Sequence, residues 1–221
     1  IGFLGPEVVL AHGVWVTEDD IRLIAETGAG VTHQPSSNLR LRSGIAPVFR
    51  MLQAGIRVGL GLDGQGINDN DDFIQEMKFC SLLHRIPSLE LNSPHLTSRQ
   101  VFKMATETNA SLLGFGQELG RLEPGRLADM VLLDYEKMCH PFVDPSHDPI
   151  DVLLYRGLGK HVHTVMVNGR IVAAAMDDAP AKDAVKKKPV KIVGKFGMPD
   201  EEFGSVMRTR PSLRTKPSMR P

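Results

Sequence analysis

The sequence has only two cysteines, Cys80 and Cys139, among its 221 residues. Secreted proteins held together by disulfide frameworks use many more, so that class is excluded and a reducing, cytoplasmic compartment is expected. No apolar run approaches the roughly 20 residues that a membrane helix requires, so we expect no membrane partner. There is no signal peptide and no initial Met. The chain instead begins within a pattern at Ile1, and we expect that a preceding segment is missing.

The chain also lacks net charge, because 26 Lys and Arg balance 26 Asp and Glu. The charges are unevenly distributed, with eleven basic and four acidic residues in 182–221 and the opposite excess before them. Residues 176–221 are therefore predicted to form a basic, Pro-containing tail that is poorly ordered. A nucleic-acid or partner-binding arm is the alternative, but we expect no nucleic-acid partner.

Residues 1–119 show alternating strand and helix patterns. Short apolar strands are predicted over 7–12, 30–33 and 56–62. A helix with Thr17 as its N-cap, ended by Gly28, is predicted after the first strand. A loop over 34–38 and a helix from about 47 to 55 are predicted after the second, and a helix from about 72 to 83 after the third. Parallel strands require such crossovers, so the pattern indicates an α/β protein with a parallel sheet. The three strands end in His12, His33 and Asp63. In a (β/α)8 barrel the carboxyl ends of the strands form the active-site face, so we expect these side chains to converge.

Residues 120–175 have a different pattern. Apolar runs at 125–134 and 163–172 predict strands, and Asn168-Gly169 within the second run predicts a two-residue hairpin, because both residues tolerate positive φ. This segment is predicted to form a small β unit that is distinct from the preceding βα units.

Histidine and aspartate at neighbouring strand ends suit a metal-assisted hydrolase. A divalent metal lowers the pKa of its bound water to about 7 and so supplies hydroxide at neutral pH. A carboxylate holds the metal and accepts a proton, while a neutral imidazole orients the nucleophile. Each residue alone is weak evidence, since an Asp before a Gly is most often a turn residue. The combination and its order are more informative.

Four motifs occur in series: Glu7-Val-Val-Leu-Ala-His12, Thr32-His33-Gln-Pro-Ser-Ser-Asn38, Gly59-Leu-Gly-Leu-Asp63-Gly64 and Gly120-Arg-Leu-Glu-Pro-Gly-Arg-Leu-Ala-Asp129. The series resembles the amidohydrolase superfamily, in its branch of purine, pterin and triazine aminohydrolases. The resemblance implies that residues 1–119 are the C-terminal part of a (β/α)8 TIM barrel, strands six to eight. It also implies that residues 120–175 are the C-terminal segment of a composite β-sandwich.

The same resemblance implies roles for four residues. His12 is expected to be catalytic and to contact the substrate, and Asp63 to bind the metal and shuttle a proton. His33 and Asn38 are expected to lie at the substrate pocket. The implied cofactor is a divalent metal, zinc with iron as the alternative, and the implied partners are a small heterocyclic substrate and a second copy of the complete protein.

The expected His-x-His pair, a further His and a Glu would lie upstream of Ile1, so the chain alone is expected to be inactive. The predicted function is hydrolysis of a carbon–nitrogen bond in an aminated heterocycle, by a purine- or pterin-type deaminase. The alternatives are a triazine chlorohydrolase or deaminase, and a truncated non-catalytic interaction chain. Cys80 is interpreted as a core residue, and His84 is given no role.

Overall fold

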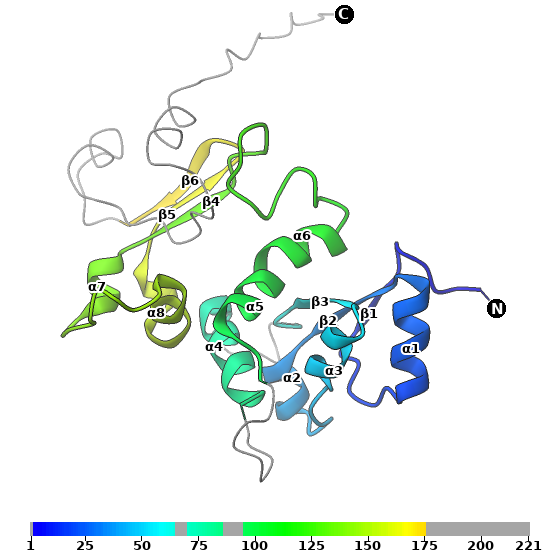
Figure 1. The fold of residues 1–221 in the computed structure, drawn as a ribbon. Helices are drawn as coiled ribbons and strands as arrows, with labels where there is room; N and C mark the ends of the chain where they lie inside the picture. Colours follow the sequence, from blue (N-terminus) through cyan, green and yellow to red (C-terminus); the bar gives the residue numbers. More distant parts are fainter. Residues whose placement is uncertain (1, 65–69, 86–94, 176–221) are drawn as a thin grey trace, which may run out of the picture.

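The computed structural model describes residues 2–64, 70–85 and 95–175 and contains two separate three-stranded sheets (Figure 1). The predicted basic tail lies outside these residues. The first sheet is parallel, in the order β1-β2-β3, and the second is antiparallel, in the order β4-β5-β6. The α/β prediction is confirmed. The antiparallel sheet lies within residues 120–175, where the sequence pattern also differs from that of residues 1–119. No helix in the described ranges is long and apolar enough to cross a membrane.

The parallel sheet is built from short strands joined by helical crossovers, and β2 and β3 are mostly buried whereas β1 is mostly exposed. Leu10, Val31 and Val58 lie beside one another in register. Helix α1 connects the first two strands, and α2 and α3 connect the next two. The elements are β1 (Val9–Ala11), α1 (Glu18–Thr27), β2 (Gly30–His33), α2 (Pro35–Arg40), α3 (Val48–Gln53) and β3 (Arg57–Leu60).

Helix α1 begins and ends as its sequence predicts. The Thr17 hydroxyl accepts a hydrogen bond from the Asp20 amide, and the Asp20 carboxylate accepts one from the Thr17 amide. This capping box satisfies amides that have no partner inside the helix. Gly28 ends the helix with φ of 74°, a conformation that favours glycine. Ile21 and Ile24 then face the core.

Helix α2 differs from the prediction, which placed a loop over Gln34–Asn38. Pro35 occupies the first helical turn, where its missing N–H is not needed and its fixed φ suits the helix. The buried carboxylate of Glu76 accepts a hydrogen bond from the Ser36 amide at 3.0 Å. This acceptor satisfies one of the free amides at the start of α2. It lies forty residues away in the chain, so the local sequence gives no sign of it.

Helical segments follow β3 in the chain, and the later ones pack against that strand. They are α4 (Phe73–Leu83), α5 (Ser98–Lys103), the π-helical turn η1 (Met104–Thr108) and α6 (Asn109–Leu112). The Asn109 side chain accepts a hydrogen bond from the Leu60 amide at 3.1 Å and donates one to the Leu60 carbonyl at 2.8 Å. It therefore pairs with the backbone at one edge of β3 as a neighbouring strand would.

The antiparallel sheet contains the predicted hairpin. Asn168 and Gly169 have φ of 47° and 73°, as the Asn-Gly pair predicted. Two helices and a short 3₁₀ turn, which the sequence did not predict, lie between the first two strands. The elements are β4 (Met130–Leu133), α7 (Tyr135–Cys139), α8 (Pro149–Arg156), η2 (Gly159–His161), β5 (Val162–Val167) and β6 (Arg170–Ala174).

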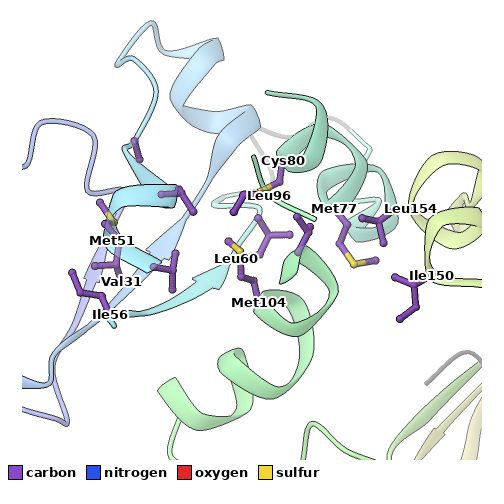
Figure 2. Close-up of a cluster of buried hydrophobic side chains, with 14 of the residues drawn as sticks. Val31, Met51, Ile56, Leu60, Met77, Cys80, Leu96, Met104, Ile150 and Leu154 are labelled. Carbon is purple, nitrogen blue, oxygen red and sulfur yellow. The ribbon is translucent and has the colours of Figure 1, made fainter. Parts of the chain in front are cut away.

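One hydrophobic core extends from the parallel sheet to α8 (Figure 2). Val31 and Met51 are fully buried at its sheet end, and Leu154 of α8 is fully buried at the other. Met77 and Cys80 of α4 lie between these groups (Figure 2). Helix α4 therefore joins the two parts of the fold, and Cys80 is a core residue as predicted.

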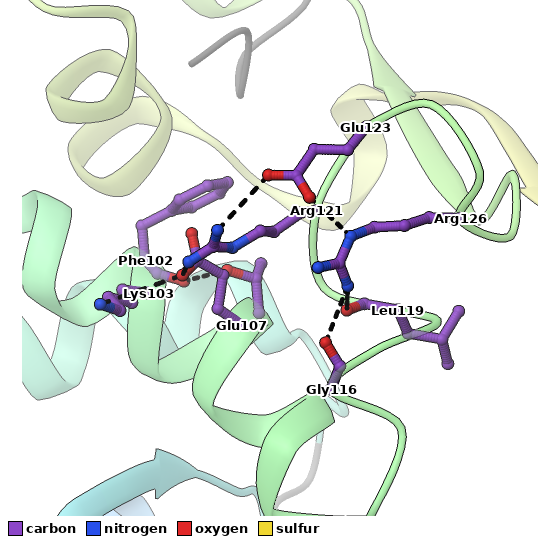
Figure 3. A network of polar contacts seen from close by, with 9 residues as sticks. Phe102, Lys103, Glu107, Gly116, Leu119, Arg121, Glu123 and Arg126 are labelled. Atoms are coloured by element: carbon purple, nitrogen blue, oxygen red, sulfur yellow. Dashed lines mark hydrogen bonds and ion pairs between the residues drawn. The ribbon is translucent and has the colours of Figure 1, made fainter. Parts of the chain in front are cut away.

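Ion pairs attach the segment before β4 to η1 (Figure 3). Arg121 contacts Glu107 of η1 at 2.8 Å and Glu123 at 3.4 Å, and Glu123 also contacts Arg126 at 2.7 Å. Arg126 additionally donates to the Gly116 carbonyl at 2.7 Å. The side chains are partly exposed, so the pairs direct the path of the chain more than they stabilise the fold.

Candidate active site

The carboxyl ends of the parallel strands bring His12 and Asp63 together. His12 follows β1 directly, Asp63 lies just beyond β3, and His12 Nε2 is 3.7 Å from Asp63 Oδ2. Both residues have positive φ, 67° and 70° respectively. Such backbone conformations are uncommon outside glycine and cluster at functional sites, because the surrounding structure has to maintain them. The predicted convergence is confirmed for these two residues.

The His12 imidazole is held by the segment that follows β2. Its Nδ1 lies 2.7 Å from Asn38 Oδ1, and the His12 backbone amide donates to Gln34 Oε1 at 2.9 Å. Because an amide oxygen faces Nδ1, that nitrogen carries the hydrogen, and Nε2 of the neutral ring keeps its lone pair. The lone pair is directed toward Asp63.

The Asp63 carboxylate has two hydrogen-bond donors. The Ser37 hydroxyl donates to Oδ2 at 2.6 Å, and the Gly64 amide donates to Oδ1 at 2.9 Å. The Ser37 hydrogen bond lowers the pKa of Asp63, partial burial opposes this shift, and the Gly64 amide and His12 lower the pKa further. Asp63 is thus an ionised acceptor at neutral pH.

In the neutral form of His12, the Nε2 lone pair and the Asp63 carboxylate are two acceptors that face each other with no hydrogen of their own between them. A cation or a water hydrogen satisfies such an arrangement. An imidazole nitrogen and a carboxylate oxygen are also the donor types that Zn²⁺ binds in hydrolases. The pair fits part of a divalent-metal site, but these two ligands are fewer than the three protein ligands of a catalytic zinc.

His33, which the sequence also placed at this site, lies in a different environment. Its side chain is fully buried, and its Nε2 is 3.0 Å from Nε2 of His84 at the end of α4. Burial, followed by the neighbouring His84 and His12, lowers the pKa of His33 to about 3. Its expected contact with substrate stays a prediction. The same holds for Asn38, which contacts His12 and whose Nδ2 is buried without a partner in the described chain.

Sequence reasoning missed Gln34, Ser37, Glu76 and His84. Gln34 and Ser37 hold the backbone of His12 and the carboxylate of Asp63, while Glu76 fixes the start of α2. Gln34 and Ser37 belong to the motif that contains Asn38, and its polar residues were the available signal. Glu76 and His84 had no local signal, because their partners lie 40 and 51 residues away.

Comparison with known proteins shows the family of the chain. A model of the amidohydrolase family matches residues 1–172. The chain belongs to the amidohydrolase family. Amidohydrolase relatives include a 5'-deoxyadenosine deaminase from Methanosarcina mazei, 42% identical over 172 residues, covering 78% of this chain and 38% of the relative. A 5-methylthioadenosine/S-adenosylhomocysteine deaminase from Thermococcus onnurineus is 40% identical over 173 residues, covering 78% and 39%.

Solved amidohydrolase structures have similar folds. A zinc-bound adenosine deaminase from Xanthomonas campestris aligns with a TM-score of 0.70 and 29% identity, over 77% of this chain and 38% of that one. A zinc-bound atrazine chlorohydrolase from Arthrobacter aurescens TC1 aligns with a TM-score of 0.69 and 32% identity, over 80% and 39%. The chain therefore spans well under half the length of the amidohydrolases that it matches.

Proposed function

We propose that the full natural chain containing these residues is a metal-dependent aminohydrolase that deaminates a purine-type heterocycle. The observation that carries the proposal is the pairing of His12 and Asp63 on strained backbone at the carboxyl ends of parallel strands. A hydrolase site needs an ionised carboxylate beside a neutral imidazole. The hydrogen bond from Ser37 favours the ionised carboxylate, and the acceptor Asn38 Oδ1 favours the imidazole tautomer with its hydrogen on Nδ1.

The reaction exchanges the exocyclic amine of the ring for an oxygen from water. Water adds to the ring carbon, the carbon–nitrogen bond breaks, and the amine leaves as ammonia. A divalent metal bound partly by Asp63 lowers the pKa of water toward neutrality. The Nε2 lone pair of His12 accepts a hydrogen bond from the attacking water and orients it toward the ring. Asp63 accepts the water proton, which must finally reach the leaving nitrogen.

Asn38 and Ser37 are proposed to act by positioning. Asn38 fixes the hydrogen on His12 Nδ1 and so keeps the lone pair on the opposite nitrogen, where it faces Asp63. Ser37 keeps Asp63 ionised. His33 and Asn38 are proposed to border the substrate pocket, and the zinc-bound relatives support zinc over iron.

The parallel unit is proposed to be the last three strands of a (β/α)8 barrel, and the antiparallel unit to be one segment of a β-sandwich. The remaining metal ligands are proposed to come from residues that precede this chain in the complete protein. Support comes from the fold similarity to deaminases more than twice as long and from the incomplete donor set of two residues.

Deamination is preferred over dechlorination. The relatives with identities of 40% and above are named as adenosine-type deaminases, whereas the chlorohydrolase is 32% identical. The fold and the His12–Asp63 pair suit both reactions, because each replaces a ring substituent with oxygen from water. The leaving group, ammonia or chloride, distinguishes them.

The test is metal content and substrate turnover of the full natural chain. Asp63→Ala is expected to abolish ammonia release from a panel of adenosine derivatives, guanine and pterins, and to lower the bound metal. Asp19→Ala is a matched control, because Asp19 is an exposed carboxylate that pairs with Arg22 on α1. Undiminished turnover by Asp63→Ala would refute the assignment, and chloride release from triazines without ammonia release from any panel member would favour the alternative.

A further inference from the structure

Helix α4 presents three side chains with possible metal-ligand atoms along one face. Glu76, Cys80 and His84 follow one another at intervals of four residues, and side chains at this spacing lie one above the other on a helix. Cys80 is fully buried, Glu76 is 2% exposed, and His84 lies half-buried where the helix ends. His84 contacts His33 at the end of β2, and Glu76 contacts Ser36 in α2.

The side chains of His33, Cys80 and His84 lie close enough together to bind one ion. The candidate ligand atoms of His33, Cys80 and His84 are all within 4.8 Å of one another. Nε2 of His33 and Nε2 of His84 are 3.0 Å apart, and the two rings are tilted by 60°. The rings therefore meet edge to edge through their nitrogens and do not stack.

The electrostatic environment keeps both imidazoles neutral. Burial lowers the pKa of His33 to about 3 and that of His84 to about 4. Neutral imidazole is the form that binds metal. A pair joined only by its hydrogen bond leaves His33 Nδ1 buried without a partner among the described residues. If a metal binds Nε2 of His33, the hydrogen lies on Nδ1, and Nδ1 still lacks an acceptor. The unpartnered Nδ1 therefore does not tell the metal-free pair from the metal-bound pair.

We propose that His33, Cys80 and His84 bind a transition-metal ion of borderline softness, of the Zn²⁺ or Co²⁺ type. One thiolate and two imidazoles suit these ions better than Mg²⁺ or Ca²⁺, which prefer oxygen ligands. The site shares no ligand with the His12–Asp63 pair. An ion there would join α4 to the end of β2 and so hold the segment that positions His12 and Asp63.

Metal binding at this site requires a change of protonation. Burial, followed by the charge of Glu76, raises the pKa of the Cys80 thiol to about 12, so the free side chain is protonated. The sulfur–hydrogen bond breaks as the sulfur–metal bond forms, and one proton is released to solvent for each ion bound. Neither sulfur nor metal changes oxidation state.

The test is titration of the chelator-treated full natural chain with Co²⁺. A thiolate ligand gives Co²⁺ a near-ultraviolet charge-transfer absorption, and the proposed catalytic residues His12 and Asp63 contain no sulfur. The band is expected to saturate at one thiolate-bound Co²⁺ per chain. Cys80→Ser is expected to remove it, and the matched control Cys139→Ser is expected to keep it.

His84→Gln supplies a second test, because His84 is half-buried and its replacement disturbs the core less than a change at Cys80. It is expected to weaken Co²⁺ binding at this band at least tenfold. A band that persists in Cys80→Ser, an unchanged affinity in His84→Gln, or no band in the wild-type chain would each overturn the proposal. The readout does not depend on catalysis, so a failure of the proposed deaminase activity would leave this result interpretable.

Discussion

Replacing Asp72 with alanine is expected to destabilise the protein by about 2 kcal/mol, from a lost cap and a lost hydrogen bond to its carboxylate. Asp72 is the N-cap of α4, and its Oδ1 accepts from the amides of Ile74 and Gln75 at 3.0 and 3.2 Å. Its Oδ2 accepts from the Gly159 amide at 2.7 Å. Gly159 begins the turn before β5, so this one carboxylate connects α4 to the antiparallel unit.

The two contributions can be separated. Loss of an N-cap costs about 1 kcal/mol. Loss of the hydrogen bond from the Gly159 amide, which is exposed, costs about 1 kcal/mol. Asparagine at this position is not equivalent to alanine, because it caps helices as well as aspartate does. Asp72→Asn is therefore expected to retain the cap, to lose the charged contact with Gly159, and to be destabilised by about 1 kcal/mol.

Urea unfolding of the full natural chain, followed by circular dichroism, gives the free energies. Burial raises the pKa of Asp72, but the hydrogen bonds from Gly159 and Gln75, with that from Ile74, outweigh it and lower the pKa below 3.8. The ionised contacts stabilise the fold above this pH, and their contribution is lost as the pH falls below it. A change of less than about 0.5 kcal/mol in Asp72→Ala would refute the reasoning, since that is the scale of ordinary surface substitutions.

Two other predictions concern the buried histidines and β3. In chelator-treated protein, the free energy of unfolding is expected to fall as the pH drops below 6.5. The pKa values of His33 and His84 in the folded protein are lowered to about 3 and about 4, so the two histidines of the unfolded chain take up protons first. The loss is at most about 1.4 kcal/mol per pH unit for each ring. Urea unfolding at about pH 7 and 5 measures it, and an equal pH slope in His84→Gln would contradict it. Gly59→Ala is expected to destabilise by about 1–3 kcal/mol, because its Cβ would overlap Asn109 Oδ1. The thermal midpoint checks this, with Gly5→Ala as the control at an uncrowded position; equal midpoints would contradict it.

The local sequence was enough to predict the βα units and the hairpin. The capping box at Thr17 and the Asn168-Gly169 turn are determined by neighbouring residues, so patterns of a few residues contain the information. The strand bounds were less accurate, because β1 and β3 are shorter than the predicted apolar runs. Helix α2 was missed for the opposite reason. Its residues favour turns as well as helix starts, and a distant carboxylate, Glu76, satisfies one of its free amides.

The candidate site divides in the same way. His12 and Asp63 were predictable, because parallel strands bring their carboxyl ends to one edge and both residues occur at those ends. The direction of each side chain was not predictable. His33 follows the same rule for strand ends, yet its ring contacts His84 on α4. That outcome depends on how α4 packs, which no pattern within β2 specifies.

Helix α4 thus determines the geometry of a site to which it contributes no proposed catalytic residue. Glu76 holds the start of α2, and His84 holds the end of β2 through His33. Ser37 and Asn38, which orient Asp63 and His12, follow these two attachments directly in the chain. Because the two proposed catalytic side chains lie on strained backbone and are held by this segment, small shifts of it would separate them. Substitutions on the buried face of α4 should therefore reduce catalysis even where they leave His12 and Asp63 unchanged.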